Sequence, residues 1–281
     1  WKRIVSATAK NLPTWAFLIS LISNGLLIVT VILLIWRQQD LNSFLGTITN
    51  SDQTESNSQT QAIAPPGERY QLNYQQWLDI LEQEANVVSN QRPANLVILA
   101  GDSLSLWFPV ELLPENKNWL NQGISGEKTA GLLKRLSLFD KTRPEAIFVM
   151  IGINDLIAGV SDRKILDNQR QIISYLRRVH PKTKIVVQSI LPHSQEQATW
   201  EGKEKLLAIP NTRIRKLNQE LQKITKQQNA SFLNLHDLFV NKAGILRPEL
   251  TTAGLHLNYN GYLVWRTALK YYTQMELLTK K

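Results

Sequence analysis

The spacing of hydrophobic residues changes along the chain. Residues 15 to 36 are almost continuously apolar, and no charge occurs between Lys10 and Arg37. Up to residue 67 the chain is then rich in Ser, Thr, Asn and Gln. From residue 68 onward, short apolar runs alternate with stretches of helical period. The pattern predicts a short N-terminal segment (1–14), a transmembrane helix (15–36), a flexible linker (37–67) and a folded domain (68–281).

The apolar segment is long enough to cross a bilayer. Its 22 residues would form a helix of about 33 Å, against a hydrocarbon core of roughly 30 Å. Trp15 and Trp36 stand where an aromatic belt is expected. A buried core helix would show a polar face, which is missing here. A cleaved signal peptide would have a shorter apolar core and a nearby small-x-small site, whereas Arg37 and polar residues follow here.

Positive charge predicts the orientation of this helix. Lys2, Arg3 and Lys10 precede the span, and Arg37 follows it. The positive-inside rule therefore places the N-terminus in the cytoplasm and the folded domain outside the cytoplasm, attached to the membrane by a single pass.

Strands and helices alternate in the folded domain. Apolar runs predict buried strands at 96–100, 146–151, 184–191 and 231–238. Helical spacing predicts helices at about 70–89, 129–138, 165–179, 212–228 and 261–277. This alternation is typical of an α/β fold in which helices cover both faces of a parallel sheet. In such sheets, ligands bind beyond the carboxyl ends of the strands.

Four short polar segments lie at or near these strand ends and in the loops. They contain Ser103, Gly123, Asn154 and His256. Acyl transfer needs a nucleophile, a base and donors for the oxyanion. Ser103 provides a hydroxyl and His256 a base that works near neutral pH. The N–H groups of Ser103 and Gly123 and the amide of Asn154 are candidate oxyanion-hole donors. Each segment alone is only a turn or a cap, but the four together form a specific set.

This set of residues resembles the SGNH/GDSL hydrolase (esterase/lipase) family. The family's four marker residues match Ser103, Gly123, Asn154 and His256, and the pattern continues at Leu257, Asn258, Gly261 and Tyr262. The resemblance extends from about residue 96 to the C-terminus. It implies a flavodoxin-like three-layer α/β/α sandwich, neither metal nor cofactor, and hydrolysis of carboxylic esters or thioesters through an acyl-enzyme.

The sequence departs from the family pattern at position 253. The family has Asp three residues before its histidine, and Ala253 stands there. Loss of such a carboxylate in a serine protease costs on the order of 10⁴ in turnover without abolishing catalysis. Three interpretations are open: a Ser103–His256 dyad oriented by another group, a weak or inactive binding domain, or a variant of an active parent. Asp237 is a less favoured substitute for the missing carboxylate.

The remaining histidines and two acids have structural interpretations. We expect His180 to face a helix C-terminus and His236 to be structural; His193 is expected to be a loop residue, with a place at the rim of the site as the alternative. Asp102 and Asp155 adjoin the candidate catalytic positions, where we expect them to hold loops by hydrogen bonds.

Composition narrows the function classes. The chain has no cysteine, which excludes disulfides and thiolate chemistry. Its formal charge of +9 indicates a solvated basic surface, with attraction to anionic lipids or an acidic polymer as sharper alternatives. No nucleic-acid motif accompanies that charge. We therefore expect a membrane-anchored esterase acting on lysophospholipid-like lipids or O-acetylated glycans, with a silent binding domain or an O-acyltransferase as alternatives.

Overall fold

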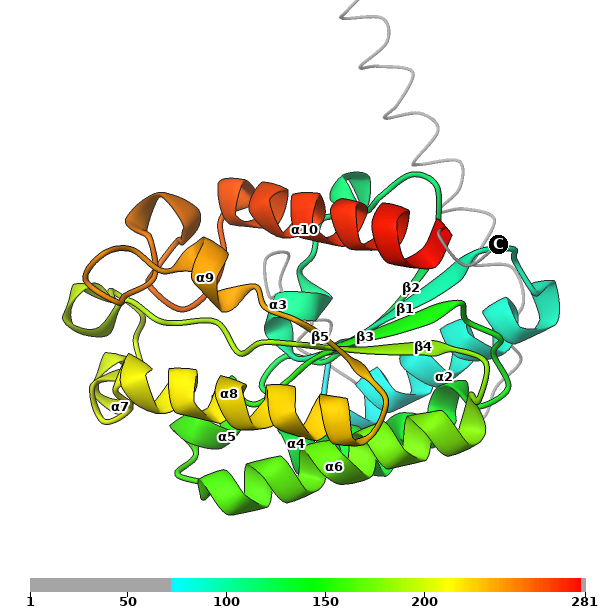
Figure 1. Cartoon of the computed structure of the whole chain (residues 1–281), viewed down its shortest axis with the longest axis horizontal. Helices are drawn as coiled ribbons and strands as arrows, with labels where there is room; N and C mark the ends of the chain where they lie inside the picture. Colours follow the sequence, from blue (N-terminus) through cyan, green and yellow to red (C-terminus); the bar gives the residue numbers. More distant parts are fainter. Residues whose placement is uncertain (1–71, 279–281) are drawn as a thin grey trace, which may run out of the picture. The chain divides into compact units, whose positions relative to one another are not determined.

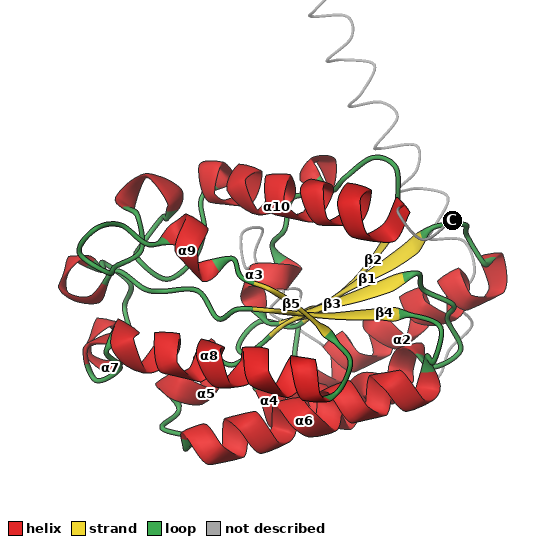
Figure 2. Cartoon of the chain, viewed as in Figure 1, coloured by secondary structure: helices red, strands yellow, loops and turns green. Residues whose placement is uncertain are grey.

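One parallel sheet organises the part of the chain that the computed structural model describes, residues 72–278 (Figures 1 and 2). The strand order is β2-β1-β3-β4-β5. The strands are β1 (Leu96–Gly101), β2 (Asn118–Gly123), β3 (Ala146–Met150), β4 (Lys184–Gln188) and β5 (Ser231–Leu233). All of the neighbouring pairs are parallel. This order is that of flavodoxin-like folds, as the resemblance implied.

Helices form the two outer layers. They are α2 (Tyr74–Gln91), α3 (Ser103–Leu106), α4 (Thr129–Arg135), α5 (Ile153–Ile157), α6 (Asp162–Val179), α7 (Lys203–Leu207), α8 (Asn211–Gln227), α9 (His236–Phe239) and α10 (Tyr259–Leu278). Figure 1 shows α10 on one face of the sheet and α2, α4, α6 and α8 on the other. The three-layer α/β sandwich predicted from the alternating pattern is therefore confirmed for residues 72–278.

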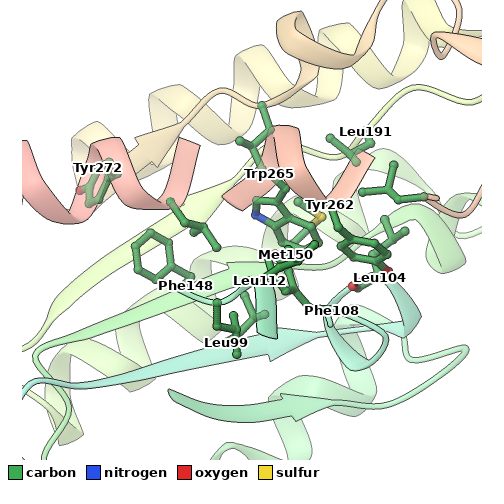
Figure 3. Close-up of a cluster of buried hydrophobic side chains, with 14 of the residues drawn as sticks. Leu99, Leu104, Phe108, Leu112, Phe148, Met150, Leu191, Tyr262, Trp265 and Tyr272 are labelled. Atoms are coloured by element: carbon green, nitrogen blue, oxygen red, sulfur yellow. Dashed lines mark hydrogen bonds between the residues drawn. The ribbon is translucent and has the colours of Figure 1, made fainter. Parts of the chain in front are cut away.

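Both faces of the central strands are buried, so the side chains of successive residues pack into different layers. Leu99 and Phe148 belong to the cluster beneath α10, whereas Ile98 and Ile147 belong to the cluster on the opposite face. Trp265 of α10 is fully buried in the first cluster (Figure 3). Successive side chains along a strand point to opposite faces of the sheet. Because both faces are buried here, these runs are continuously apolar in the sequence.

The register of the sheet brings three strand ends level. Gly101 of β1 pairs with Gly123 of β2 and with Met150 of β3. The chain therefore leaves all three strands at the same edge. Ser103 and Asn154 follow two of these ends by a few residues, so they share that edge with Gly123.

Three strand assignments differ from the predictions. Residues 118–123 form β2, although the sequence analysis predicted no strand there, because this edge strand mixes polar and apolar side chains. The run at 231–238 is a strand only at Ser231–Leu233, and His236–Phe239 then form the short helix α9. The predicted third run likewise ends early, at Gln188.

The predicted segments 1–14, 15–36 and 37–67 lie outside the described residues. Among residues 72–278, no helix combines the length and the apolar character that a membrane crossing requires.

Candidate active site

Ser103 is the first residue of α3, the short helix that follows β1. The carboxylate of Asp102 caps this helix, because its Oδ1 accepts from the backbone N–H of Leu104 at 3.0 Å. Ser103 itself is buried, with 5% of its surface exposed. The strand end and the cap together fix the direction in which the serine hydroxyl leaves the sheet edge.

His256 reaches Ser103 from a loop that precedes α10. Its Nε2 lies 3.3 Å from the Ser103 Oγ, although the two residues are 153 positions apart. Burial lowers the pKa of His256 below its usual range. The predicted pair of hydroxyl and neutral imidazole is therefore present, at a distance that suits proton transfer after slight tightening.

Backbone contacts hold the loop that carries His256. The carbonyl of Ala253 accepts from the N–H groups of Thr199 and Trp200, both at 3.0 Å, and the carbonyl of Gly254 accepts from Ser194 at 2.8 Å. Gly254 has φ +86°, and a Cβ there would lie 2.7 Å from the Cα of Ala198. Only glycine fits this turn without strain.

Trp107 contacts the imidazole of His256 and was missed by the sequence analysis. Its ring centroid lies 4.6 Å from that of His256, with 58° between the ring planes. Trp107 is the C-cap of α3, and its backbone N–H donates to the carbonyl of Ser103 at 3.0 Å. The spacing of four residues from Ser103, one helical turn, was the signal in the sequence.

Gly123 lies at the end of β2, but its N–H already has a partner. It donates to the Oδ1 of Asn121 at 3.0 Å, and the Asn121 side chain donates in turn to the carbonyl of Ser105 at 2.7 Å. A Cβ on Gly123 would lie 2.4 Å from the backbone N of Leu106. Glycine is therefore required here by close packing against α3.

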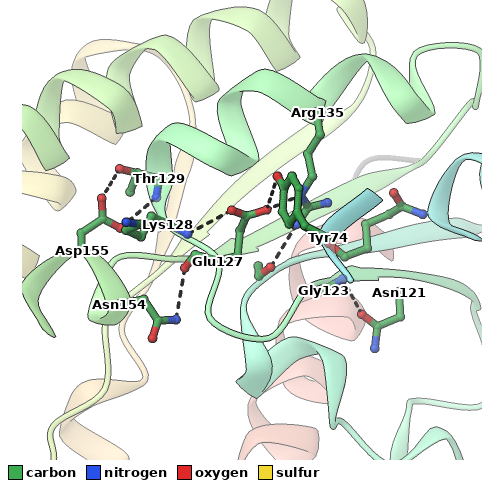
Figure 4. Close-up of polar contacts among 11 residues, drawn as sticks. Tyr74, Asn121, Gly123, Glu127, Lys128, Thr129, Arg135, Asn154 and Asp155 are labelled. Atoms are coloured by element: carbon green, nitrogen blue, oxygen red, sulfur yellow. Dashed lines mark hydrogen bonds and ion pairs between the residues drawn. The ribbon is translucent and has the colours of Figure 1, made fainter. Parts of the chain in front are cut away.

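Asn154, near the start of α5, belongs to a buried polar network (Figure 4). Its Nδ2 donates to the carbonyl of Glu127 at 3.1 Å. The carboxylate of Glu127 pairs with the Nε of Arg135 at 2.8 Å, and both side chains are almost completely buried. The Nη2 of Arg135 donates to the carbonyls of Gly101 and Gln122. Arg135 thus ties together the strand ends that lead to Ser103 and to Gly123.

Two acidic residues hold loops, as predicted. Asp155 accepts from the N–H of Thr129 at 2.8 Å and from its hydroxyl at 2.6 Å, which fixes the start of α4 beside α5. Burial raises the pKa of Asp155. Burial also raises the pKa of Asp102 to about 7, and the nearby charges of Asp155 and Glu127 add to the rise.

Asp237 does not replace the missing carboxylate, so that suggestion was wrong. Its side chain is 72% exposed and bonds to Asn234 and His236. His193 lies in a loop, as predicted, but it is fully buried and so does not line the rim: its Nε2 meets the carbonyl of Ile209 at 2.7 Å, and its Nδ1 accepts from the backbone N–H of Gln195.

His180 and His236 are also buried. His180 follows α6 and stacks on Phe139. Burial lowers the pKa of both histidines, so both favour the neutral form. Within residues 72–278, no group of three or more acidic or histidine side chains is arranged to hold a metal ion.

The network around Glu127 and Arg135 was also missed. Glu127 directly follows Gly126, and Arg135 closes α4. Both read as ordinary surface charges in the sequence, because a charged side chain shows no local sign that it is buried and paired.

Comparisons with known proteins agree with this arrangement. The model of the GDSL-like Lipase/Acylhydrolase family matches residues 100–264. A Streptococcus pneumonia protein, provisionally described as a platelet activating factor, is 28% identical, with a TM-score of 0.63 over 70% of this chain and 93% of its own. A GDSL-like lipase from Bacteroides thetaiotaomicron shares the fold at 17% identity, with a TM-score of 0.57 over 70% of this chain and 98% of its own.

A curated relative with a different described activity matches part of the chain. The N-acylneuraminate cytidylyltransferase of Streptococcus agalactiae serotype III (strain NEM316) is 29% identical over 165 residues, which are 59% of this chain and 35% of that protein. The chain thus spans about a third of this relative's length. Taken with the Ser103–His256 contact and the sheet topology, the family match shows that the chain belongs to the GDSL-like lipase/acylhydrolase family.

Proposed function

We propose that this domain cleaves carboxylic esters through an acyl-enzyme on Ser103. His256 takes the proton of Ser103 while the serine Oγ attacks the ester carbonyl. His256 then protonates the leaving alcohol. Water attacks the acyl-enzyme with His256 again as base, which releases the acid and restores the serine. The 3.3 Å contact between the Ser103 Oγ and the His256 Nε2 is the observation that carries this proposal.

The oxyanion is proposed to lie among three donors. These are the backbone N–H groups of Ser103 and Gly123 and the side-chain amide of Asn154. Asn154 keeps a second amide hydrogen beyond the one it gives to Glu127. The N–H of Gly123 becomes available only when the Asn121 side chain turns away.

We propose that the acyl group enters a narrow cavity next to the site. Its lining includes Asp102, Leu104, Ile153, Ile190 and Leu255 but not Ser103, Asn154 or His256, and it has room for about one water molecule. These positions include direct neighbours of Ser103, Asn154 and His256. A small apolar recess favours acetyl-sized groups, and therefore O-acetylated glycans over long-chain lysophospholipid-like lipids as substrates.

The test is hydrolysis of p-nitrophenyl esters of graded chain length by the purified chain and by Ser103→Ala. We expect turnover of the acetate and butyrate, little turnover of the octanoate, and none above background in Ser103→Ala. Equal rates in the two proteins would reject the enzyme mechanism and favour a silent binding domain, which Ala253 motivates. A preference for octanoate would reject only the short acyl group.

We also propose that residues 15–36 anchor the protein in a membrane with the hydrolase domain outside the cytoplasm. Support comes from the length of the apolar segment and from the positive residues before it. Protease added to cells whose outer layer has been removed should digest the domain. Protection of the domain until the membrane is lysed would contradict this orientation.

A further inference from the structure

The catalytic imidazole is not bonded to any carboxylate in the part of the chain that the structure describes. Its Nε2 faces the Ser103 Oγ, and no acid contributes to the shift of its pKa, whose cause is burial alone. Ala253 stands at the family's acidic position, and Asp237 is exposed and bonded elsewhere. The usual means of orienting the ring and of stabilising its charged form is therefore missing.

The backbone contacts of the loop do not orient the ring by themselves. The carbonyl of His256 accepts from the Thr251 hydroxyl at 2.6 Å and from the Thr252 N–H at 3.1 Å, which fixes the main chain. The outer torsion of a histidine side chain is broad and roughly two-fold. A second contact on the ring is needed to keep the Nε2 toward Ser103.

The indole of Trp107 provides that contact. It packs on the imidazole at 4.6 Å between centroids, from the same helical turn that carries Ser103. The backbone N–H of Trp107 donates to the carbonyl of Ser103, so the main chain that carries the indole is one helical turn from the nucleophile. Tyr262 of α10 strengthens the arrangement, since its hydroxyl donates to the carbonyl of Leu104 at 3.1 Å.

We propose that Trp107 is a positioning residue that holds the His256 ring toward Ser103 in place of the absent carboxylate. The inference rests on the proposed esterase mechanism. Aromatic ring contacts are worth about two- to tenfold in the population of the packed state. The indole contacts the ring but brings no negative charge to the imidazolium.

The proposal makes Trp107 and position 253 interdependent. If the indole replaces the carboxylate, restoring the acid should make the indole dispensable. The experiment compares kcat and KM for p-nitrophenyl acetate in the full-length chain, Trp107→Leu, Ala253→Asp and the double variant. Trp107→Phe tests whether a ring alone suffices, and Val110→Ala is the control, since Val110 is 79% exposed.

We expect Trp107→Leu to lower kcat about tenfold with KM changed less than twofold, and Trp107→Phe to retain at least a third of the wild-type kcat. In the Ala253→Asp background the leucine substitution should cost less than twofold, because the carboxylate then orients the ring. Equal losses in both backgrounds, or a change confined to KM, would overturn the proposal. Circular dichroism checks that each variant folds.

A second measurement does not depend on turnover. NMR of His256 reports its pKa and its ring environment in each variant. Trp107→Leu should shift the ring resonances and raise the pKa toward the ordinary value, because the ring loses its cover. If those changes occur but the wild type hydrolyses no ester, the contact stands and the proposed function fails. If hydrolysis occurs but the His256 ring resonances are unchanged in Trp107→Leu, the positioning proposal fails.

Discussion

The two sides of the active site are held by different interactions. On the donor side, Asn154 is fixed through Glu127 to the buried cation of Arg135 (Figure 4). On the histidine side, the contacts of the His256 ring within residues 72–278 are a hydrogen bond to Ser103 and a ring contact to Trp107. Buried charge organises the first side and aromatic packing the second. A substitution in the buried Glu127–Arg135 pair should therefore affect the fold, whereas one that removes the ring contact to His256 should affect the rate.

The largest expected effect comes from breaking the buried ion pair. Arg135→Ala leaves Glu127 charged and unpaired, and removes the bonds to two strand-end carbonyls. We expect a loss of about 3–5 kcal/mol in the free energy of unfolding. Urea denaturation followed by circular dichroism measures it. Lys223→Ala, which breaks an exposed pair, should cost at most about 1 kcal/mol. Similar losses of stability in Arg135→Ala and Lys223→Ala would show that the buried pair contributes no more than the exposed one.

Asp102, which caps the helix that carries Ser103, should make the free energy of unfolding depend on pH. The folded protein keeps its proton up to about pH 7, whereas the unfolded chain releases it near 3.8. Unfolding therefore releases a proton between these values, and the contribution of Asp102 to stability falls as pH rises from 4 to 7. Because one pKa unit is about 1.4 kcal/mol, the change is at most about 4 kcal/mol.

Asp102→Asn is the matched variant, because its side-chain oxygen can still cap α3. Its stability relative to the wild type should increase as pH rises through this range, in urea denaturation at several pH values. A difference that stays constant from pH 4 to pH 7 would show that the folded carboxyl titrates normally.

Asn154→Ala should separate catalysis from stability. Loss of one oxyanion donor typically lowers kcat by about 10²–10³. The variant should lose only about 1 kcal/mol of stability, because it removes a single hydrogen bond to the carbonyl of Glu127. Asn90→Ala, at an exposed position of α2, is the control for both measurements. A loss of kcat below fivefold would exclude Asn154 from the oxyanion hole.

The smallest effect concerns the pH profile. Burial lowers the pKa of His256, and the ring must be neutral to act as a base. Activity should therefore be lost as pH falls through a midpoint below 6.5. Ala253→Asp should move the midpoint upward, because a nearby carboxylate favours the imidazolium. Profiles of kcat/KM for p-nitrophenyl acetate test both shifts; a wild-type midpoint above 6.5 would contradict the burial of the ring.

The sequence predicts the parts of this fold that depend on local pattern. The runs at β1 and β3 are apolar on both faces, so they were recognised as buried strands. The edge strand β2 lacks that pattern and was missed, and His236–Phe239 was assigned to a strand because its length and composition suit either structure.

The same distinction applies to the active site. The partnership of Ser103 and His256 was predicted, because each residue stands in a recognisable motif. The contacts from Glu127 to Arg135 and Asn154, and from Trp107 to His256, depend on how separate elements pack. No local pattern encodes such packing. For the same reason the suggestion of Asp237 was wrong: its place in the sequence did not show which way its helix faces.

Covalent labelling tests the central claim most directly. A fluorophosphonate traps a serine whose proton is taken by a nearby base. We expect one equivalent on the full-length chain, mapped to Ser103 by peptide mass spectrometry, with none on Ser103→Ala and a rate at least 100-fold lower on His256→Ala. Labelling of another residue, or an unchanged rate in His256→Ala, would contradict the Ser103–His256 dyad.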